Sequence, residues 1–174
     1  MKRQYKPLFF SIRPLFIQNV KGKAEALLRN FFRCGIAGWC LEVIFTSSES
    51  WMQGDMRLMG RTSLWMFPIY GMGVFLPGIV NAADHWLTGL SAFPDAGTDR
   101  ISPAARLVRH GLMDMVLIFT AEYVTGMLLK HFNVCPWDYS VWPDHISGVI
   151  RLAFAPLWFG TGLLFEMLQT PPAS

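Results

Sequence analysis

Residues 31–45 read FFRCGIAGWCLEVIF, an apolar run that contains one carboxylate, Glu42. Residues 111–129 repeat the arrangement with Glu122. A carboxylate among hydrocarbon side chains is energetically expensive and therefore rare, so each of these positions is a candidate functional site. The search for a site in this chain starts from the pair.

The composition of the 174 residues indicates a polytopic membrane protein. Hydrophobic residues make up 52% and charged residues only 16%, and the mean hydropathy is +0.32. That is too little charge to cover a water-soluble domain of this size. The net charge of +3 is small and its basic residues gather near the start of the chain, so we expect no nucleic-acid partner.

Four segments are long enough to cross a bilayer, for which roughly 20 mostly apolar residues are needed. They cover about residues 31–50, 63–87, 107–129 and 146–168. We predict an all-α integral membrane protein with these four transmembrane helices in a single domain over 31–168, followed by a tail at 169–174. The basic segment 1–30 is broken by prolines and lacks a cleavage site, which favours an interfacial helix over a signal peptide.

The distribution of Lys and Arg predicts the orientation. With four spans, eleven of the fifteen basic residues fall on the side of the N-terminus and the 91–106 linker. The positive-inside rule therefore places both termini in the cytoplasm. In this topology Glu42 and Glu122 lie at nearly one level, beyond the midplane toward the outer face. Arg61 and Arg151 approach the same layer from the second and fourth spans.

Helical spacing predicts that the carboxylates point into the bundle. Gly35 and Gly38 fall on the same face of the first span as Glu42, and small residues mark a face that packs closely against other helices. Two interpretations of the charged set stay open. The carboxylates and guanidiniums form either a ligand- or proton-binding site or an internal ion pair that fixes helix register.

Two local patterns predict irregular backbone. Pro68 and Pro77 each remove an amide donor with Gly71 between them, so we expect a kinked or locally unwound second span, either static or with free carbonyls that bind a ligand. Residues 133–140 read NVCPWDYS, which predicts either a short ordered outer loop before the last helix or an ordinary turn with aromatic anchors.

The cysteines and histidines indicate no metal site and no cofactor. Cys34, Cys40 and Cys135 are scattered, so we expect free, buried thiols. His131 and Cys135 lack the partners that a zinc site needs.

Several motifs in one order complete the pattern: residues 38–43 (GWCLEV), 60–65 (GRTSLW), 68–73 (PIYGMG), 122–126 (EYVTG) and 137–140 (WDYS), followed by Gly148. From Arg33 to Glu166 the chain thereby resembles the ABC-transporter type IV (CmpB-like) membrane proteins and their small eukaryotic relatives, the transmembrane protein 229 family. Those relatives carry Gly-Arg before the last helix, whereas the arginine here is Arg151.

The resemblance implies a permease-like role. The matching positions and the buried charges give two sets of candidates. The ligand- or proton-binding candidates are Glu42, Arg61, Tyr70, Glu122, Asp138, Tyr139 and Arg151. The structural candidates are Trp39, Trp65, Pro68, Gly71, Trp137 and Gly148.

Three functions follow as hypotheses. The leading one is a permease-like or ligand-binding subunit, which would need a separate ATPase because the chain has no phosphate-binding loop, and a second copy or another membrane subunit because four spans form a small pathway. The second is a membrane enzyme acting on a lipid or amphipathic substrate, although neither a nucleophile elbow nor a metal signature is present and no catalytic residue is assigned. The third is an accessory membrane protein with structural charges.

Overall fold

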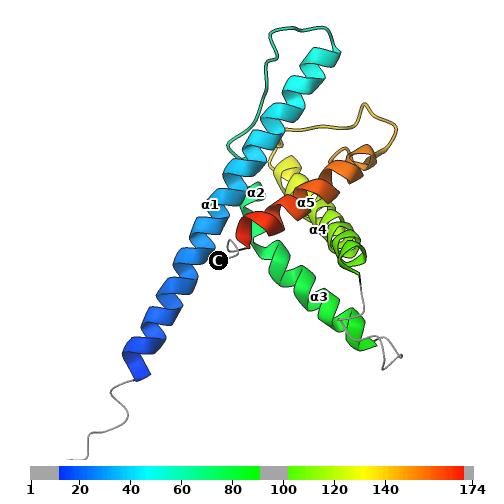
Figure 1. Cartoon of the computed structure of the whole chain (residues 1–174). Helices are drawn as coiled ribbons and strands as arrows, with labels where there is room; N and C mark the ends of the chain where they lie inside the picture. Colours follow the sequence, from blue (N-terminus) through cyan, green and yellow to red (C-terminus); the bar gives the residue numbers. More distant parts are fainter. Residues whose placement is uncertain (1–11, 91–101, 171–174) are drawn as a thin grey trace, which may run out of the picture.

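The computed structural model describes residues 12–90 and 102–170. The fold is mostly helical, with one short hairpin and irregular segments between the helices (Figure 1). Helix α1 covers Ile12–Met52. The next apolar stretch consists of α2 (Met66–Gly71), the 3-10 turn η2 (Met72–Phe75) and α3 (Leu76–Leu90). Helix α4 covers Pro103–His131 and α5 covers Ala155–Gln169.

Three helical stretches among the described residues are long and apolar enough to cross a membrane. They are Met66–Leu87, Pro103–His131 and Leu152–Gln169. Their composition and their largely exposed apolar side chains are those of an all-α membrane protein. Helix α1 contains the predicted first span. Arg33, Glu42 and the polar residues 46–50 of that span lower the hydropathy of the helix. A crossing by α1, and with it the fourth span, stays a prediction.

Helix α1 differs from the expected division at residue 30. Residues 12–52 form one continuous helix, so the structure has no break between an interfacial segment and a first span. Pro14 does not interrupt the helix because it lies in the first turn, where its missing amide has no intrahelical partner to lose. Residues 1–11, the linker 91–101 and residues 171–174 of the predicted tail lie outside the described residues.

The second apolar stretch has the irregularity that its prolines predict. Between α2 and α3 the chain tightens into η2 and then resumes an α-helix. Pro77 cannot donate to the carbonyl of Gly73, one turn earlier. The backbone amide of Leu76 donates to this oxygen instead, and so does the side-chain amide of Gln169 of α5, at 3.0 Å. This carbonyl is therefore not a free ligand-binding group.

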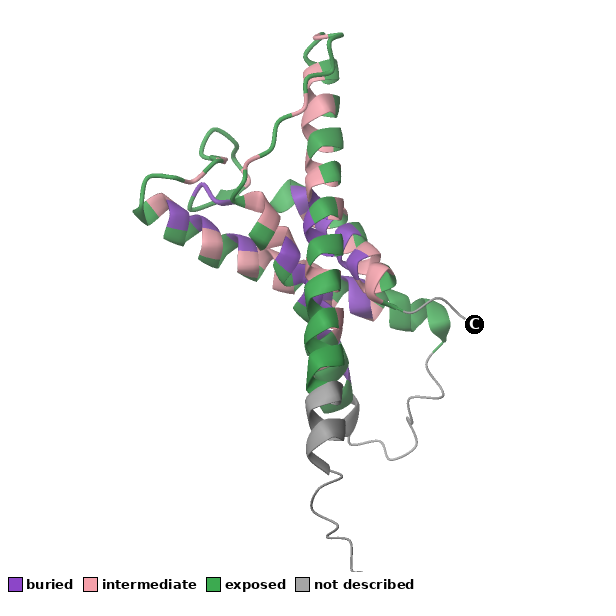
Figure 2. Ribbon diagram, turned by 90° about the vertical axis from the view of Figure 1, so that its left-hand side faces the viewer, coloured by how far each residue is buried: buried purple, intermediate pink, exposed green. Residues whose placement is uncertain are grey.

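The helices meet where their backbones can approach. Gly35 and Gly38 are buried on α1, as the stripe of small residues predicts, and they pack against the rings of Phe67 and Tyr70. Figure 2 shows the buried residues at this junction and the largely exposed lower part of α1. The core contains Cys34, Leu76 and Phe165.

The last helix starts later than predicted. Residues 145–151, expected at the start of a helix from residue 146, form an antiparallel hairpin in which β1 (His145–Ile146) pairs with β2 (Ile150–Arg151). The 3-10 turn η4 (Leu152–Phe154) then leads into α5. The backbone amide of Ala153 bonds to Asp144 Oδ2 at 2.8 Å, so this carboxylate caps the turn that opens the helix.

Candidate functional site

Residues 53–65, between α1 and α2, form an irregular segment that runs back along α1 and holds Glu42 in place. The backbone of this segment has few partners of its own, and side chains of α1 form hydrogen bonds with it. Thr46 Oγ1 accepts a hydrogen bond from the amide of Arg61 at 2.8 Å, and Trp39 Nε1 donates to the carbonyl of Ser63 at 3.0 Å. The hydroxyl of Thr62 is thereby held against Glu42 and donates to Oε2 at 2.6 Å.

Glu122 is buried on α4 and faces α5. Its Oε2 accepts a hydrogen bond of 3.1 Å from Trp158 Nε1, and both side chains are buried. A buried indole needs an acceptor for its N–H group, and here that acceptor is the carboxylate. The pair fixes the carboxylate at the wall between the two helices.

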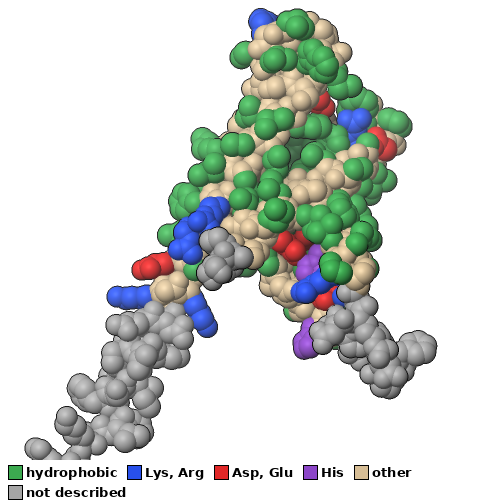
Figure 3. Space-filling view, in the orientation of Figure 1, with side chains coloured by type: hydrophobic (Ala, Val, Ile, Leu, Met, Phe, Trp, Pro, Cys, Tyr) green, Lys and Arg blue, Asp and Glu red, His purple; other side chains and the backbone are tan. Residues whose placement is uncertain are grey.

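Both carboxylates line one cavity of about 300 Å³ between α1, α4 and α5, at the recess that Figure 3 shows between α1 and α5. Arg61, Tyr70 and Tyr139 line it too. Aromatic and hydroxyl side chains form most of the remaining wall; they include Phe45, Thr46, Thr62, Trp137, Phe154, Trp158 and Thr161. The predicted convergence of Glu42 and Glu122 on one enclosed space is present in the geometry.

Neither Glu42 nor Glu122 forms an ion pair. Among the side chains of residues 20–87 and 102–170, no Lys, Arg or His nitrogen lies within 4.0 Å of Glu42 or Glu122. A register-fixing ion pair between these acids and Arg61 or Arg151 is therefore not formed. Glu42 and Glu122 each accept from one neutral side-chain donor, Thr62 and Trp158 respectively.

Arg151 lies outside the cavity lining, contrary to the expected convergence, and the candidate Asp138 lies outside it too. Arg151 belongs to β2, where its Nε lies 3.7 Å from Asp144 Oδ1 and its guanidinium stacks on the ring of Trp142 at 3.6 Å. The guanidinium of Arg151 thus contacts residues just before the hairpin, and not the carboxylates of the cavity. Asp138 is exposed and accepts from the hydroxyl of Ser140 at 2.6 Å, which holds the pKa of Asp138 below its ordinary value.

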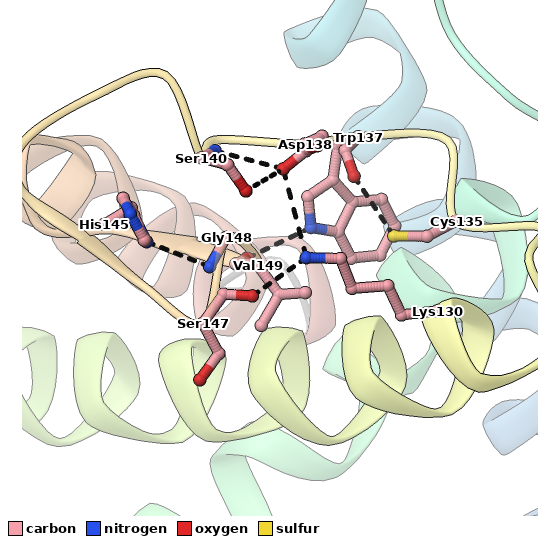
Figure 4. Close-up of polar contacts among 9 residues, drawn as sticks. All are labelled: Lys130, Cys135, Trp137, Asp138, Ser140, His145, Ser147, Gly148 and Val149. Carbon is pink, nitrogen blue, oxygen red and sulfur yellow. Dashed lines mark hydrogen bonds and ion pairs between the residues drawn. The ribbon is translucent and has the colours of Figure 1, made fainter.

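The loop before α5 is ordered by hydrogen bonds, several of which Figure 4 shows. Trp137 Nε1 donates to the carbonyl of Val149 at 3.0 Å. The amide of Tyr139 donates to the carbonyl of Gly148 at 2.8 Å. Lys130 Nζ donates to the carbonyl of Ser147 at 3.0 Å and so ties the loop to the end of α4. The loop before the last helix is therefore ordered, and its place on the outer side stays a prediction.

Gly148 allows close packing within this loop, and Tyr139 extends from the loop to the cavity. Gly148 has a φ of +69°, a left-handed conformation that glycine adopts without strain. A β-carbon there would lie 2.7 Å from Lys130 Nζ and 2.9 Å from Asp138 Oδ1. The half-buried Tyr139 faces the cavity, where burial and then the charges of Glu122 and Glu42 raise the pKa of its hydroxyl. The phenol therefore stays protonated and able to donate.

The other structural candidates differ in burial. Gly71 is buried against the ring of Phe31, whereas Trp65 and Pro68 are exposed. All three cysteines are free, as expected, but only Cys34 is buried and Cys40 is exposed.

Sequence reasoning gave no site role to Trp158 and Thr62, which are the donors to Glu122 and Glu42. Glu49, which shares one face of the first span with Glu42, is a third acid in the lining. Trp158 carried a usable signal, because a tryptophan in an apolar helix needs an acceptor for its N–H group when it turns inward. Thr62 had none, since its place depends on how the segment after α1 folds back.

No group of three or more His, Cys, Asp or Glu side chains in the described part of the chain is arranged to hold a metal ion. The cavity is instead a small polar space with aromatic walls. A comparison with known families finds that residues 29–174 match the sequence model of the family described as "Putative ABC-transporter type IV". No solved structure matches the chain.

Proposed function

Because this chain belongs to the ABC-transporter type IV family, we propose that it is a permease-like membrane subunit whose cavity binds a small ligand bearing an ammonium group. The observation that carries the proposal is the pair Glu42 and Glu122. Both line one cavity, and neither has a cation within 4.0 Å among the described residues. A ligand cation would supply the charge that the protein itself does not.

The rest of the wall suits such a ligand. Trp137, Trp158 and Tyr70 surround the carboxylates, and aromatic faces attract ammonium groups by cation–π interaction. Arg61 lines the same cavity and is exposed, so it could hold an anionic group at the other end of a zwitterion. The volume of about 300 Å³ fits a molecule the size of a lipid headgroup.

A permease role requires partners. Since the chain has no phosphate-binding loop, a separate ATPase subunit would supply the energy, and a second copy or another membrane subunit would complete the pathway. The cavity would then be the part of the pathway contributed by this chain.

The experiment is a binding measurement on the full chain in lipid nanodiscs. Choline and phosphocholine are titrated while tryptophan fluorescence is followed, because Trp137 and Trp158 line the cavity. We expect saturable binding of choline that is lost in the double variant Glu42→Gln, Glu122→Gln and kept in Glu25→Gln, an exposed carboxylate of α1. Arg61→Gln should weaken phosphocholine more than choline.

The outcomes separate the three functions. Lost binding and lost uptake by vesicles that also contain the partner ATPase, with intact folding, would support the permease subunit. Conversion of a phospholipid without nucleotide, abolished by the same double variant, would support the enzyme. An equal response of the double variant and the parent to both probes would refute the binding site and leave the carboxylates a structural role.

A further inference from the structure

Asp114 is an acid of α4 that does not line the cavity described above. Its side chain is fully buried, with 0% exposure, and both carboxylate oxygens lack a hydrogen-bond partner. The side chain is buried because α5 crosses α4 at this point. Gly162 of α5 faces it so closely that a β-carbon there would lie 2.8 Å from Asp114 Cγ.

The other aspartates of the described residues all have partners. Asp55 pairs with Arg57 at 2.9 Å, and Asp138 accepts from Ser140 at 2.6 Å. Asp84 lies 2.6 Å from Arg109 Nε, and Asp144 caps η4 and pairs with Arg151. Asp114 is thus the most deeply buried of these acids and has neither a cation nor a donor.

His110 and Glu166 lie on the same side of the α4–α5 contact. His110 precedes Asp114 by one helical turn, and its Nδ1 lies 3.0 Å from each carboxylate oxygen of Glu166 on α5. Its Nε2 is buried and has no partner. Both His110 and Asp114 therefore present unpartnered polar atoms at the contact between the two helices.

A cavity of about 360 Å³ reaches His110 and Glu166 beside Asp114. Its lining includes Asn81 of α3, Arg106 and His110 of α4, and Glu166 and Thr170 at the end of α5. Figure 3 shows acidic, histidine and basic side chains gathered at this junction of α3, α4 and α5. Asp114 itself does not line the cavity, so water there exchanges protons with His110 and Glu166, and His110 lies one helical turn from Asp114.

The charges around Asp114 decide which ligand fits. On its own helix these are His110, Arg106 and Arg109; α5 contributes Glu166, and α3 contributes Asp84, which is already engaged with Arg109. Glu166 and His110 act on Asp114 electrostatically. No set of three metal-binding side chains exists in the described chain, so a metal ion lacks ligands.

We propose that Asp114, with the His110–Glu166 pair beside it, is a proton-binding site. An ionised carboxylate at this position would be buried without a donor or a cation, which is costly, whereas the neutral acid is tolerated beside Gly162. Asp114 therefore holds a proton in the packed state. Loss of this proton places a charge in the tightest part of the α4–α5 contact, so the two helices separate enough to admit water.

The first test is infrared spectroscopy of the full chain in nanodiscs with [4-¹³C]aspartate. A protonated carboxyl has a carbonyl band separate from those of ionised carboxylates, and the isotope assigns it to aspartate. We expect one such band near neutral pH in the parent and in Glu25→Gln, and none in Asp114→Asn. The spectrum of the labelled parent can refute the proposal even if the variant does not fold. No labelled band in the parent, or the same band in Asp114→Asn, would overturn the proposal.

The second test is the pH dependence of unfolding. A proton that the native state holds and the unfolded state releases makes the native state less stable as the pH rises, by up to about tenfold in the unfolding constant per pH unit. Asp114→Asn should remove this slope, and His110→Gln should alter it without removing the infrared band. Equal slopes in the parent and Asp114→Asn would overturn the proposal. Choline binding in the other cavity is a separate readout, so failure of one site is distinguishable from failure of the other.

Discussion

Substitution of Gly162 by alanine tests the crossing of α4 and α5. The added β-carbon would lie 2.8 Å from Asp114 Cγ and 2.9 Å from Oδ2. Asp114 Cβ would lie nearer still. Carbon atoms in contact are separated by about 3.5–4.0 Å, so the helices would have to separate by more than about 1 Å. The atoms that block the methyl group lie close to the α4 backbone and cannot swing away. Overpacking of this kind costs about 1–3 kcal/mol.

Gly160→Ala is the matched control, because it makes the same chemical change two residues away in α5. A β-carbon at Gly160 meets nothing within 4 Å. Alanine is there favoured over glycine by up to about 1 kcal/mol of helix propensity.

The assay is thermal unfolding of both variants and the parent in the same nanodiscs. At about 2–4 °C per kcal/mol for a chain of this size, Gly162→Ala should lower the Tm by about 2–12 °C. Gly160→Ala should leave it unchanged or raise it. Equal Tm values for the two variants would refute the close approach of the helices and the burial argument for Asp114.

Three further predictions concern single contacts. Trp158→Phe removes the donor to the buried Glu122 and should lower the free energy of unfolding by about 1–3 kcal/mol, measured by chemical denaturation. Gly148→Ala imposes a side chain on a left-handed residue and should cost about 1–2 kcal/mol in the same assay, with faster proteolysis of the hairpin loop. Hydrogen bonds from Ser140 lower the pKa of Asp138, so the ionised carboxylate stabilises the loop at pH values above its ordinary pKa of 3.8. This stabilisation is lost as the pH falls below 3.8 and the carboxylate takes up a proton. Amide exchange at Ser140 should therefore accelerate at low pH in the parent and not in Asp138→Asn.

Hydrophobicity and proline positions were sufficient to predict most of the fold. The apolar segments 63–87 and 107–129 coincide closely with helical stretches of the structure, and the break between Pro68 and Pro77 is η2. Helix geometry was also sufficient to predict that Glu42 and Glu122 face one space, because the inward direction depends only on spacing along each helix. Their level in a membrane stays a prediction. These features follow from periodicity within single segments.

The start of α5 was missed although the sequence contained its signals. Pro156 lies in the first turn of α5, a position that proline favours, and Asp144 precedes the turn that it caps. Ser147 and Gly148 are typical of a turn, and both have positive φ. The prediction gave more weight to the apolar stretch from residue 146 than to these turn signals. It therefore placed Arg151 in a helix and not in the hairpin.

The environment of Asp114 and His110 could not be read from sequence. Their positions in the first half of α4 suggest a place near the membrane interface. Both side chains are nevertheless buried inside the protein, because α5 lies across them. Which residues of two helices meet depends on the crossing angle and on small residues such as Gly162, and both are properties of the pair. The same limit applies to Thr62, whose contact with Glu42 depends on the path of an irregular segment.

The hydrogen bond from Gln169 to the carbonyl of Gly73 links the end of the final helix to the bend of the second apolar stretch. The backbone amide of Leu76 donates to the same oxygen, so this carbonyl has donors from two parts of the chain. A slide or tilt of α5 would break the bond from Gln169, and the cost of that loss opposes such a movement. Both cavities border α5, so a ligand in either one would act on the helix that this bond anchors.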